Sequence, residues 1–282
     1  MSDHVLDSIE ETLVSATADI RTLLVDRDYT AEFNPSGERQ LAADTAADNL
    51  LAERLGGLES VGAYASEEQE TIQDHGTGLS IAVDPLDGSS NLVSNNPMGT
   101  IVSVYDQSLP APASTLRAAW YVLYGPITTL VALRDQTVTE AIIDDGSIIK
   151  RSALEIPDDP TIYGFGGRVP EWSSEVTALV KEFESELKLR YGGAMVADVN
   201  QVLSYGGIFS YPAVESAPNG KLRLQFEAIP IAAIMEAAGG ASTTGTKPIT
   251  AVDPSKLHQR TPLFVGNRSL ITRVENEFQP NL

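Results

Sequence analysis

The sequence predicts a layered fold of the α/β or α+β class, on the basis of three observations. Segments in which apolar residues recur at helical spacing alternate with short apolar runs typical of strands along the whole chain. At 282 residues, the chain can bury a full-sized core, either as one large domain or as two joined lobes. A hydrophobic content of 42%, with no repeat and no low-complexity tract, is typical of a globular protein rather than a disordered one.

The first half of the chain is predicted to begin with two helices and to continue as strands. The helices are expected at 2–25 and, after the turn-rich stretch 34–37, at 40–55, where a Gly-Gly pair ends the second. We expect these helices to pack as a pair on a sheet. Short apolar runs bounded by turns predict strands at 61–65, 79–83, 99–105, 116–124 and 128–133.

The second half is predicted to mix helices and strands beyond a turn-rich segment. Residues 145–160 are the best candidate for a boundary between two lobes, which we draw as 1–153 and 154–282. Helical spacing and alternation then predict the elements that follow. The expected helices are 171–187, 195–204 and 230–238, and the expected strands are 206–211 and 221–226.

Cysteine is absent and histidine is rare, which limits the chemistry available to this chain. The lack of cysteine excludes a thiol nucleophile, a cysteine-ligated zinc or iron–sulfur site and a disulfide. Three histidines offer little material for a histidine-rich metal site or a Ser-His-Asp triad. Any reaction here must therefore depend on carboxylates, hydroxyls and amines.

Acidic residues outnumber basic ones by 39 to 19, which gives a formal net charge of -20. This balance argues against nucleic-acid binding, because that function needs clustered cations to neutralise phosphates. It favours adaptation to a salty cytoplasm, since near 1 M salt the Debye length falls to about 3 Å and self-repulsion is screened. An acidic protein from an ordinary organism is the alternative. No stretch is long and apolar enough for a membrane span, and the acidic N-terminus lacks a signal-peptide pattern, so we expect a cytoplasmic protein with no membrane partner.

The most informative segment runs from Leu79 to Asn91 and reads LSIAVDPLDGSSN. A hydrophobic strand delivers Asp84 and Asp87, three residues apart, and a proline fixes the turn between them. We expect both carboxylates and the backbone carbonyl of Leu86 to face one point, which suits a hard cation such as Mg²⁺. The glycine and two serines that follow offer backbone N–H groups and hydroxyls to a phosphate, at the start of a helix.

The acidic pairs also have simpler interpretations. Asp84 to Gly88 could form only a turn, and Glu67-Glu68 could be a solvated surface pair. Both pairs, however, end neighbouring apolar runs, and strands that end together would bring four carboxylates to one edge of a sheet. Crowded like charges raise one another's pKa unless cations neutralise them, so metal binding is the more economical interpretation.

The sequence contains an ordered series of short blocks, which are Ser66–Glu68, Asp84–Asn91, Met98–Ile101, Arg190-Tyr191, Met195–Val199, Tyr205–Pro212, Asn219–Glu227, Gly239–Gly245 and His258–Arg260. From about residue 36 to 267 this series resembles the class I fructose-1,6-bisphosphatases, within the larger group of lithium-sensitive, Mg²⁺-dependent sugar phosphatases. The order of the blocks along the chain is more specific than any single block. The resemblance implies an αβαβα fold with two mixed sheets between layers of helices, and a phosphoric monoester hydrolase that uses two or three Mg²⁺ ions, with Mn²⁺ as an alternative.

Carried over residue by residue, the resemblance assigns roles within this pattern. Asp44 and Glu68 are expected to activate the attacking water, assisted by Glu38, where the family carries an aspartate. The expected metal ligands are Glu67, Asp84, Asp87, Glu227 and the carbonyl of Leu86. The cleaved phosphate is expected on Gly88, Ser89 and Ser90. The distal phosphate and the sugar are expected on Tyr191, Tyr211 and Lys221.

Two further features follow from the resemblance. Arg190 would reach into the site of a neighbouring subunit, which implies a homo-oligomer, either a dimer or a tetramer. The N-terminal lobe would carry most metal ligands and the phosphate loop, and the C-terminal lobe would bind the sugar phosphate. The segment 164–169 departs from the family pattern, because glycine and valine stand where the family has an asparagine and a tyrosine of the distal site. Arg168 is a candidate replacement for the missing contact.

The predicted function is hydrolysis of the 1-phosphate of fructose 1,6-bisphosphate to fructose 6-phosphate and phosphate, a step of gluconeogenesis. The near alternatives are phosphatases of the same fold that act on inositol monophosphate, sedoheptulose 1,7-bisphosphate or a nucleotide. Ser89 after the acidic turn and Phe226 before Glu227 favour the bisphosphatase, because inositol phosphatases usually carry Asp-Gly-Thr and Trp-Asp there. The distant alternative is a non-catalytic phosphate-binding scaffold.

Overall fold

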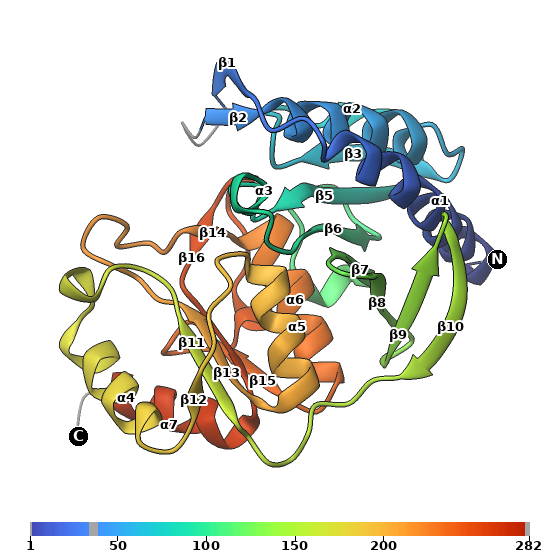
Figure 1. The fold of residues 1–282 in the computed structure, drawn as a ribbon. Helices are drawn as coiled ribbons and strands as arrows, with labels where there is room; N and C mark the ends of the chain where they lie inside the picture. Colours follow the sequence, from blue (N-terminus) through green and yellow to red (C-terminus); the bar gives the residue numbers. More distant parts are fainter. Residues whose placement is uncertain (1, 34–38, 280–282) are drawn as a thin grey trace.

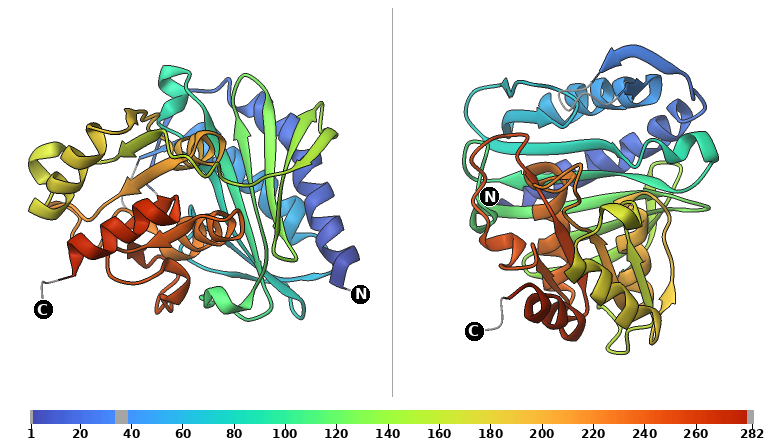
Figure 2. Two further views of the ribbon diagram at one scale, coloured as in Figure 1. Left: turned by 90° about the horizontal axis from the view of Figure 1, so that it is seen from below. Right: turned by 90° about the vertical axis from the view of Figure 1, so that its left-hand side faces the viewer.

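The computed structural model describes residues 2–33 and 39–279, and in this part of the chain helices and sheets alternate in five layers (Figure 1). The helices are α1 (Ser2–Leu23), α2 (Ala42–Gly56), α3 (Asn91–Ser94), α4 (Ser174–Glu184), α5 (Met195–Tyr205), α6 (Ile229–Ala237) and α7 (Arg268–Phe278). The first layer contains α1 and α2, the third contains α5 and α6, and the fifth contains α4 and α7, with a sheet in each space between (Figure 2). The predicted αβαβα fold with two mixed sheets is confirmed.

The larger sheet comes entirely from residues 61–153 and has the strand order β10-β9-β8-β7-β6-β5-β3-β4. Its strands are β3 (Val61–Ser66), β4 (Gln73–Asp74), β5 (Leu79–Asp87), β6 (Met98–Tyr105), β7 (Leu116–Tyr124), β8 (Thr128–Arg134), β9 (Thr137–Asp144) and β10 (Ser147–Ala153). Only β3 and β5 are parallel neighbours, and Ser66 pairs with Val83 near their ends. Glu67, which follows β3, and Asp84, which lies in the last part of β5, are therefore at the same edge of the sheet.

This half differs from the prediction at two places. The segment Asp84 to Asp87, expected as a turn, is the end of β5, and its pairing with β6 shifts register there. A proline cannot donate to the strand ladder, and such a residue is tolerated at an irregularity of this kind. The β9–β10 hairpin is not predicted by the apolar pattern, because every residue of β10 is exposed.

The smaller sheet comes from residues 162–266 and has the strand order β12-β11-β13-β17-β15. Its strands are β11 (Ile162–Phe165), β12 (Lys188–Leu189), β13 (Gly207–Tyr211), β15 (Ala241–Thr243) and β17 (Leu263–Gly266). Separate two-stranded ribbons pair β1 (Tyr29–Phe33) with β2 (Arg39–Leu41), and β14 (Leu222–Arg223) with β16 (Arg260–Thr261). Short 3₁₀ turns are η1 (Ala113–Thr115), η2 (Val169–Glu171) and η4 (Ile249–Ala251).

The strand predicted at 221–226 is wrong beyond Arg223. Residues Leu224–Ala228 form a buried π-helical turn, η3, that leads directly into α6. Alternation of apolar and polar residues suggests a strand here, but the whole turn is buried, so its polar side chains are not on a solvent face. Turns of this kind often occur at functional sites, and this one carries Glu227.

Apolar side chains form three clusters that fill the spaces between the five layers. The middle cluster includes Ile101, Tyr121, Val199, Ile231 and Val265, so it joins both sheets to α5 and α6. The other two lie between the first helix layer and the larger sheet, and between the smaller sheet and the last helix layer. None of the helices within residues 2–33 and 39–279 has the length and apolar character needed to cross a membrane.

Candidate active site

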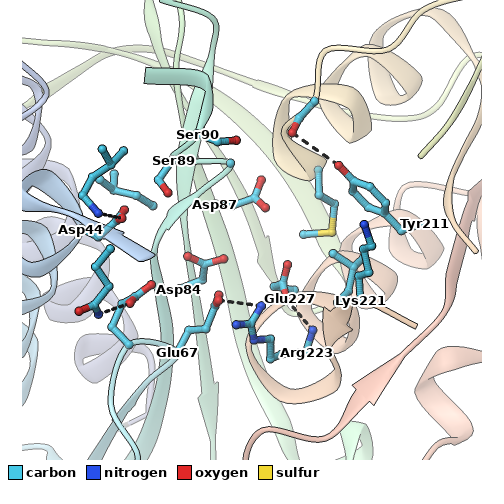
Figure 3. A pocket seen from close by; sticks show the side chains of 18 of the residues that line it. Asp44, Glu67, Asp84, Asp87, Ser89, Ser90, Tyr211, Lys221, Arg223 and Glu227 are labelled. Atoms are coloured by element: carbon cyan, nitrogen blue, oxygen red, sulfur yellow. Dashed lines mark hydrogen bonds and ion pairs between the residues drawn. The ribbon is translucent and has the colours of Figure 1, made fainter. Parts of the chain in front are cut away.

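Most of the predicted site residues line one pocket of about 460 Å³. The pocket lies where β3 and β5 end, and its opposite wall comes from the start of α5, the end of β13 and the segment around η3. Arg190 does not line this pocket. Glu38 lies outside the described residues. The site is therefore built from both halves of the chain (Figure 3).

Three buried carboxylates converge at the base of the pocket. Glu67 follows β3, and its backbone N–H donates to the Val83 carbonyl of the parallel neighbour at 2.9 Å, which places it beside Asp84. Glu227 reaches the same point from η3. One oxygen from each carboxylate lies within 4.8 Å of the others, and Figure 3 shows the three groups around a common space.

This cluster contains more negative than positive charge. The buried Arg223 guanidinium forms an ion pair with Glu67 at 3.0 Å, and the Arg223 backbone N–H donates to Glu227. Burial, followed by the charge of Glu67, raises the pKa of both Asp84 and Glu227 well above their ordinary values. Removing these groups from water disfavours their charged forms, and one buried arginine does not offset that cost.

Asp87 lies beside the start of α5. Its Oδ2 accepts a 2.6 Å hydrogen bond from the Val196 backbone N–H. Burial raises the pKa of Asp87 to about 7, while this hydrogen bond works in the opposite direction. Leu86, whose carbonyl is an expected ligand, also lines the pocket.

The donor set fits a divalent cation. It offers only oxygen atoms, from buried carboxylates that come close together and carry excess negative charge. Hard cations such as Mg²⁺ prefer oxygen ligands of this kind, and a bound cation would relieve the repulsion that raises these pKa values. Glu67, Asp84 and Glu227 form the nearest set, with Asp87 and Leu86 beside it.

A second acidic group lies on the side of α2. Asp44 is in the first turn of that helix, and its Oδ2 accepts a 2.9 Å hydrogen bond from the Leu41 backbone N–H. Glu68 accepts a hydrogen bond from the Gln40 side chain. Burial, followed by the charge of Glu67, raises the pKa of Glu68 to about 8. Asp44 and Glu68 line the same pocket as the metal-binding acids.

The Gly88–Ser90 loop forms the next part of the wall. Gly88 has φ +74°, and a Cβ at this residue would lie 2.2 Å from the Cβ of Ala194, so only glycine fits here. Ser89 and Ser90 line the pocket, and Ser90 is exposed to solvent. The helix that follows, α3, has only four residues, so the loop itself supplies the groups that a phosphate could contact.

The far end of the pocket is aromatic. The hydroxyls of Tyr191 and Tyr211 lie 3.0 Å apart, and the Tyr211 ring packs edge-on against Phe209 at 5.3 Å. Lys221 lies at the rim, where it is exposed. The three residues expected to hold the distal phosphate are thus brought together, although they come from separate segments of the second half.

Two candidate residues lie outside the pocket. The Arg190 guanidinium is on the outer face of α5, where it donates to Gln201 at 3.3 Å and covers the Tyr205 ring at 4.9 Å. Arg168, the candidate replacement in the distal site, is exposed and acts electrostatically on Glu171. These positions neither support nor contradict the roles expected of Arg190 and Arg168.

Sequence reasoning assigns no role to Gln40 or Arg223, although both contact site carboxylates. Arg223 carries one signal that could have identified it, since it precedes Glu227 by four residues within a largely apolar segment. Gln40 has no comparable signal, because a polar residue before a helix usually faces solvent.

Fold and site together define a class of protein. An αβαβα architecture that surrounds buried carboxylates, an adjacent Gly-Ser-Ser loop and a polar aromatic end is typical of a sugar phosphatase that depends on carboxylates. Comparisons with known proteins identify the family within this class.

Residues 3–149 match the family model described as "Fructose-1-6-bisphosphatase, N-terminal domain", and residues 156–279 match the corresponding C-terminal domain. The chain therefore belongs to the fructose-1,6-bisphosphatase family, whose members are metal-dependent phosphate-releasing hydrolases. A class 1 fructose-1,6-bisphosphatase of Natronomonas pharaonis is 56% identical over 275 residues, which cover 96% of this chain and 97% of the relative. The predicted adaptation to salt fits this relative.

Two further relatives support the same family. A class 1 fructose-1,6-bisphosphatase of Halobacterium salinarum is 52% identical over 276 residues, covering 96% of each chain. Among solved structures, Leishmania major fructose-1,6-bisphosphatase in its holo form is 28% identical with a TM-score of 0.87. That alignment covers 96% of this chain and 91% of the Leishmania chain.

Proposed function

We propose that this chain hydrolyses the 1-phosphate of fructose 1,6-bisphosphate to give fructose 6-phosphate and inorganic phosphate. The observation that carries the proposal is the set of chemical groups that line one pocket and the order in which they lie. Its carboxylate cluster, its Gly88–Ser90 loop and its tyrosine–lysine end lie in the order that a sugar with two phosphates requires. Membership of the family supplies the substrate class.

In this proposal the substrate spans the pocket. The 1-phosphate lies on Gly88, Ser89 and Ser90, next to the carboxylates. The 6-phosphate and the sugar contact Tyr191, Tyr211 and Lys221. Two tyrosine hydroxyls and an ammonium group can donate several hydrogen bonds to a phosphate. An unphosphorylated, neutral end of the sugar could not accept these hydrogen bonds equally well.

The metal-binding role belongs to Glu67, Asp84, Asp87, Glu227 and the Leu86 carbonyl. We propose two or three Mg²⁺ ions as the natural metal, with Mn²⁺ as an alternative. When bound, these cations neutralise the charge that builds up on the phosphoryl group and on the departing sugar oxygen.

The carboxylates on the side of α2 accept the proton of the attacking water. A water molecule held near Asp44 and Glu68 loses its proton to a carboxylate oxygen as it attacks phosphorus. The bond between phosphorus and the sugar oxygen breaks, and that oxygen takes up a proton from solvent to become the hydroxyl of fructose 6-phosphate, while the carboxylate returns its proton to solvent. Gln40 holds Glu68, and the Leu41 N–H holds Asp44, so both acceptors are oriented in advance. Glu38 is proposed to assist this pair.

Three expectations remain part of the proposal. The lobes 1–153 and 154–282 would divide the labour, with the carboxylates mainly in the first and the sugar-phosphate contacts in the second. Arg190, exposed on the outer face of α5, would reach a neighbouring subunit's site in a dimer or tetramer. The cytoplasm remains the expected location.

The direct test is phosphate release from a panel of substrates at high KCl with Mg²⁺. We expect fructose 1,6-bisphosphate to exceed inositol 1-phosphate and a nucleoside monophosphate by at least about tenfold in kcat/KM, and chelation of the metal to abolish turnover. Preference for inositol 1-phosphate or sedoheptulose 1,7-bisphosphate would favour a neighbouring activity of the same fold. Phosphate binding without turnover would favour the scaffold.

A further inference from the structure

The turn between β12 and α5, residues 191–194, carries Tyr191 at the sugar-phosphate end of the pocket. This turn is held from two sides by buried polar side chains, Asn91 and Asp198, that do not line the pocket. One comes from the segment that follows the Gly88–Ser90 loop, and the other comes from α5. The turn is therefore tied to both ends of the substrate pocket.

Asp198 holds the turn through its backbone N–H groups. Its Oδ1 accepts from Gly192 at 2.6 Å and its Oδ2 accepts from Gly193 at 3.1 Å. The side chain of Gln201 donates to Oδ1 at 3.1 Å. The carboxylate is only 2% exposed, so these charge-assisted bonds form away from competing water.

Asn91 holds the same turn through a backbone carbonyl. Its Nδ2 donates to Gly192 at 2.9 Å and to Pro97 at 2.9 Å, and the residue is buried. Asn91 directly follows Ser90, the last residue of the proposed phosphate loop. A single amide thus connects the loop that would hold the reacting phosphate to the turn that carries Tyr191.

Two further contacts support this connection. Gly88 packs so closely on Ala194 that a Cβ would lie 2.2 Å from the alanine methyl, and Asp87 accepts a hydrogen bond from the Val196 N–H. Residues 87–91 and residues 192–196 therefore meet at three points. Tyr191 in turn positions Tyr211 through their 3.0 Å hydroxyl contact.

We propose that Asn91 and Asp198 are positioning residues that fix the separation between the Gly88–Ser90 loop and the Tyr191–Tyr211 pair. By holding that separation, they make the pocket select sugars with two phosphates over sugars with one. This inference rests on the proposed function, because it assumes that the reacting phosphate lies on the loop and the distal phosphate on the tyrosines. A displacement of about 1 Å between binding groups can cost a large part of such discrimination.

The test compares fructose 1,6-bisphosphate with fructose 1-phosphate, which lacks the distal phosphate. In Asn91→Ala we expect the ratio of kcat/KM values, bisphosphate over monophosphate, to fall about tenfold, with most of the change in KM for the bisphosphate. The matched control is Asn96→Ala, in the same segment, which removes an exposed hydrogen bond to Ser94 and should leave the ratio unchanged.

Asp198 supplies a second variant that keeps the shape of the side chain. Asp198→Asn retains one acceptor for the turn and should lower the ratio less than Asp198→Ala does. A variant that binds Mg²⁺ like wild type, unfolds cooperatively and loses activity equally on both substrates would overturn the inference, since a purely structural role predicts equal losses. Failure of the wild-type enzyme to hydrolyse fructose 1,6-bisphosphate would overturn the proposed function itself, which is a different result.

Discussion

The two ends of the pocket are built in different ways. At the reaction end, Asp84 is only 3% exposed, and its partners come from the ends of paired strands and a buried π-helical turn. At the recognition end, Tyr191 is 46% exposed and Lys221 lies at the rim, both on irregular segments. Strand register places Glu67 and Asp84 at the first end, whereas at the second end only Tyr211 lies on a strand, and turns and side-chain contacts place Tyr191 and Lys221.

This difference separates chemistry from selectivity. Burying several carboxylates together costs free energy, because their charged forms lose contact with water and repel one another. A bound cation can offset this cost. The recognition end contains fewer charges, so changes there should alter which sugar binds without removing turnover. Substitutions at the two ends should therefore affect different kinetic constants.

The largest effect is expected at the reaction end. Asp84→Asn removes one negative charge from the buried cluster and a ligand from the metal set. A metal ion supplies several kcal/mol of transition-state stabilisation, so we expect kcat to fall by about 10³-fold or more. Phosphate release from fructose 1,6-bisphosphate, measured across a range of Mg²⁺ concentrations, would show the loss.

The matched control is Asp106→Asn, which makes the same chemical change in an exposed ion pair with Arg117. Its activity should equal that of wild type, because exposed ion pairs contribute little. If Asp84→Asn kept activity within a few-fold of wild type, the assignment of the cluster to metal binding would be wrong.

A smaller, selective effect is expected at the recognition end. Tyr211→Phe removes the hydroxyl that contacts Tyr191 and faces the distal site. A hydrogen bond to a charged group is worth about 1.5–3 kcal/mol, so KM for fructose 1,6-bisphosphate should rise about 10- to 100-fold while kcat changes little. The control Tyr205→Phe keeps the ring that Arg190 covers and should leave both constants unchanged. A fall in kcat alone would contradict the division of labour between the two ends.

The contrast between the two ends of the pocket also explains which site residues could be predicted from the sequence. Glu67 and Asp84 follow adjacent apolar runs, and parallel pairing of those runs is enough to bring the acids together. The layered fold also follows from the alternation of helical and strand patterns. Tyr191, Tyr211 and Lys221 have no local pattern of this kind, and only the family resemblance indicated them.

Other features depend on contacts between distant segments. Gln40, Asn91 and Asp198 are polar residues whose partners lie elsewhere in the chain or in a turn with no regular pattern. The sequence of the π-helical turn around Glu227 alternates apolar and polar residues as a strand does. The exposed strand β10 lacks the apolar pattern that would predict a strand. Local propensity alone does not determine these features, because tertiary packing decides them.

Gly166 offers a sharper test of the recognition end. A Cβ there would lie 2.2 Å from two carbons of the Tyr211 ring, so Gly166→Ala should push that ring out of its position. An off-rotamer side chain costs about 1 kcal/mol, so KM for fructose 1,6-bisphosphate should rise about fivefold with kcat unchanged. Gly125→Ala is the control, since its nearest neighbour, the Ile127 carbonyl, lies at 3.6 Å and accommodates a methyl group. Equal KM values in the two variants would show that the ring position does not limit binding.

The smallest expected effect concerns stability of the metal-free protein. The folded state raises the pKa of Glu68 to about 8 and of Asp87 to about 7, whereas both groups have lower values when unfolded. Between those values the folded protein binds more protons than the unfolded chain, so stability falls as pH rises. His258 acts in the opposite direction below about pH 6.5, because burial lowers its pKa, but it is one half-buried group.

We therefore expect the Tm of EDTA-treated protein at constant high salt to fall by several degrees from about pH 5 to about pH 8, since 1 kcal/mol corresponds to about 2–4 °C in proteins approaching this size. Mg²⁺ should raise the Tm most at the upper end of that range, because the carboxylates are then charged and the cation binds the folded state. Glu68→Gln should flatten the slope, as it removes one of the titrating groups. A Tm in EDTA that rises with pH would mean that buried charge at the reaction end does not oppose folding, and the physical contrast between the two ends would be lost.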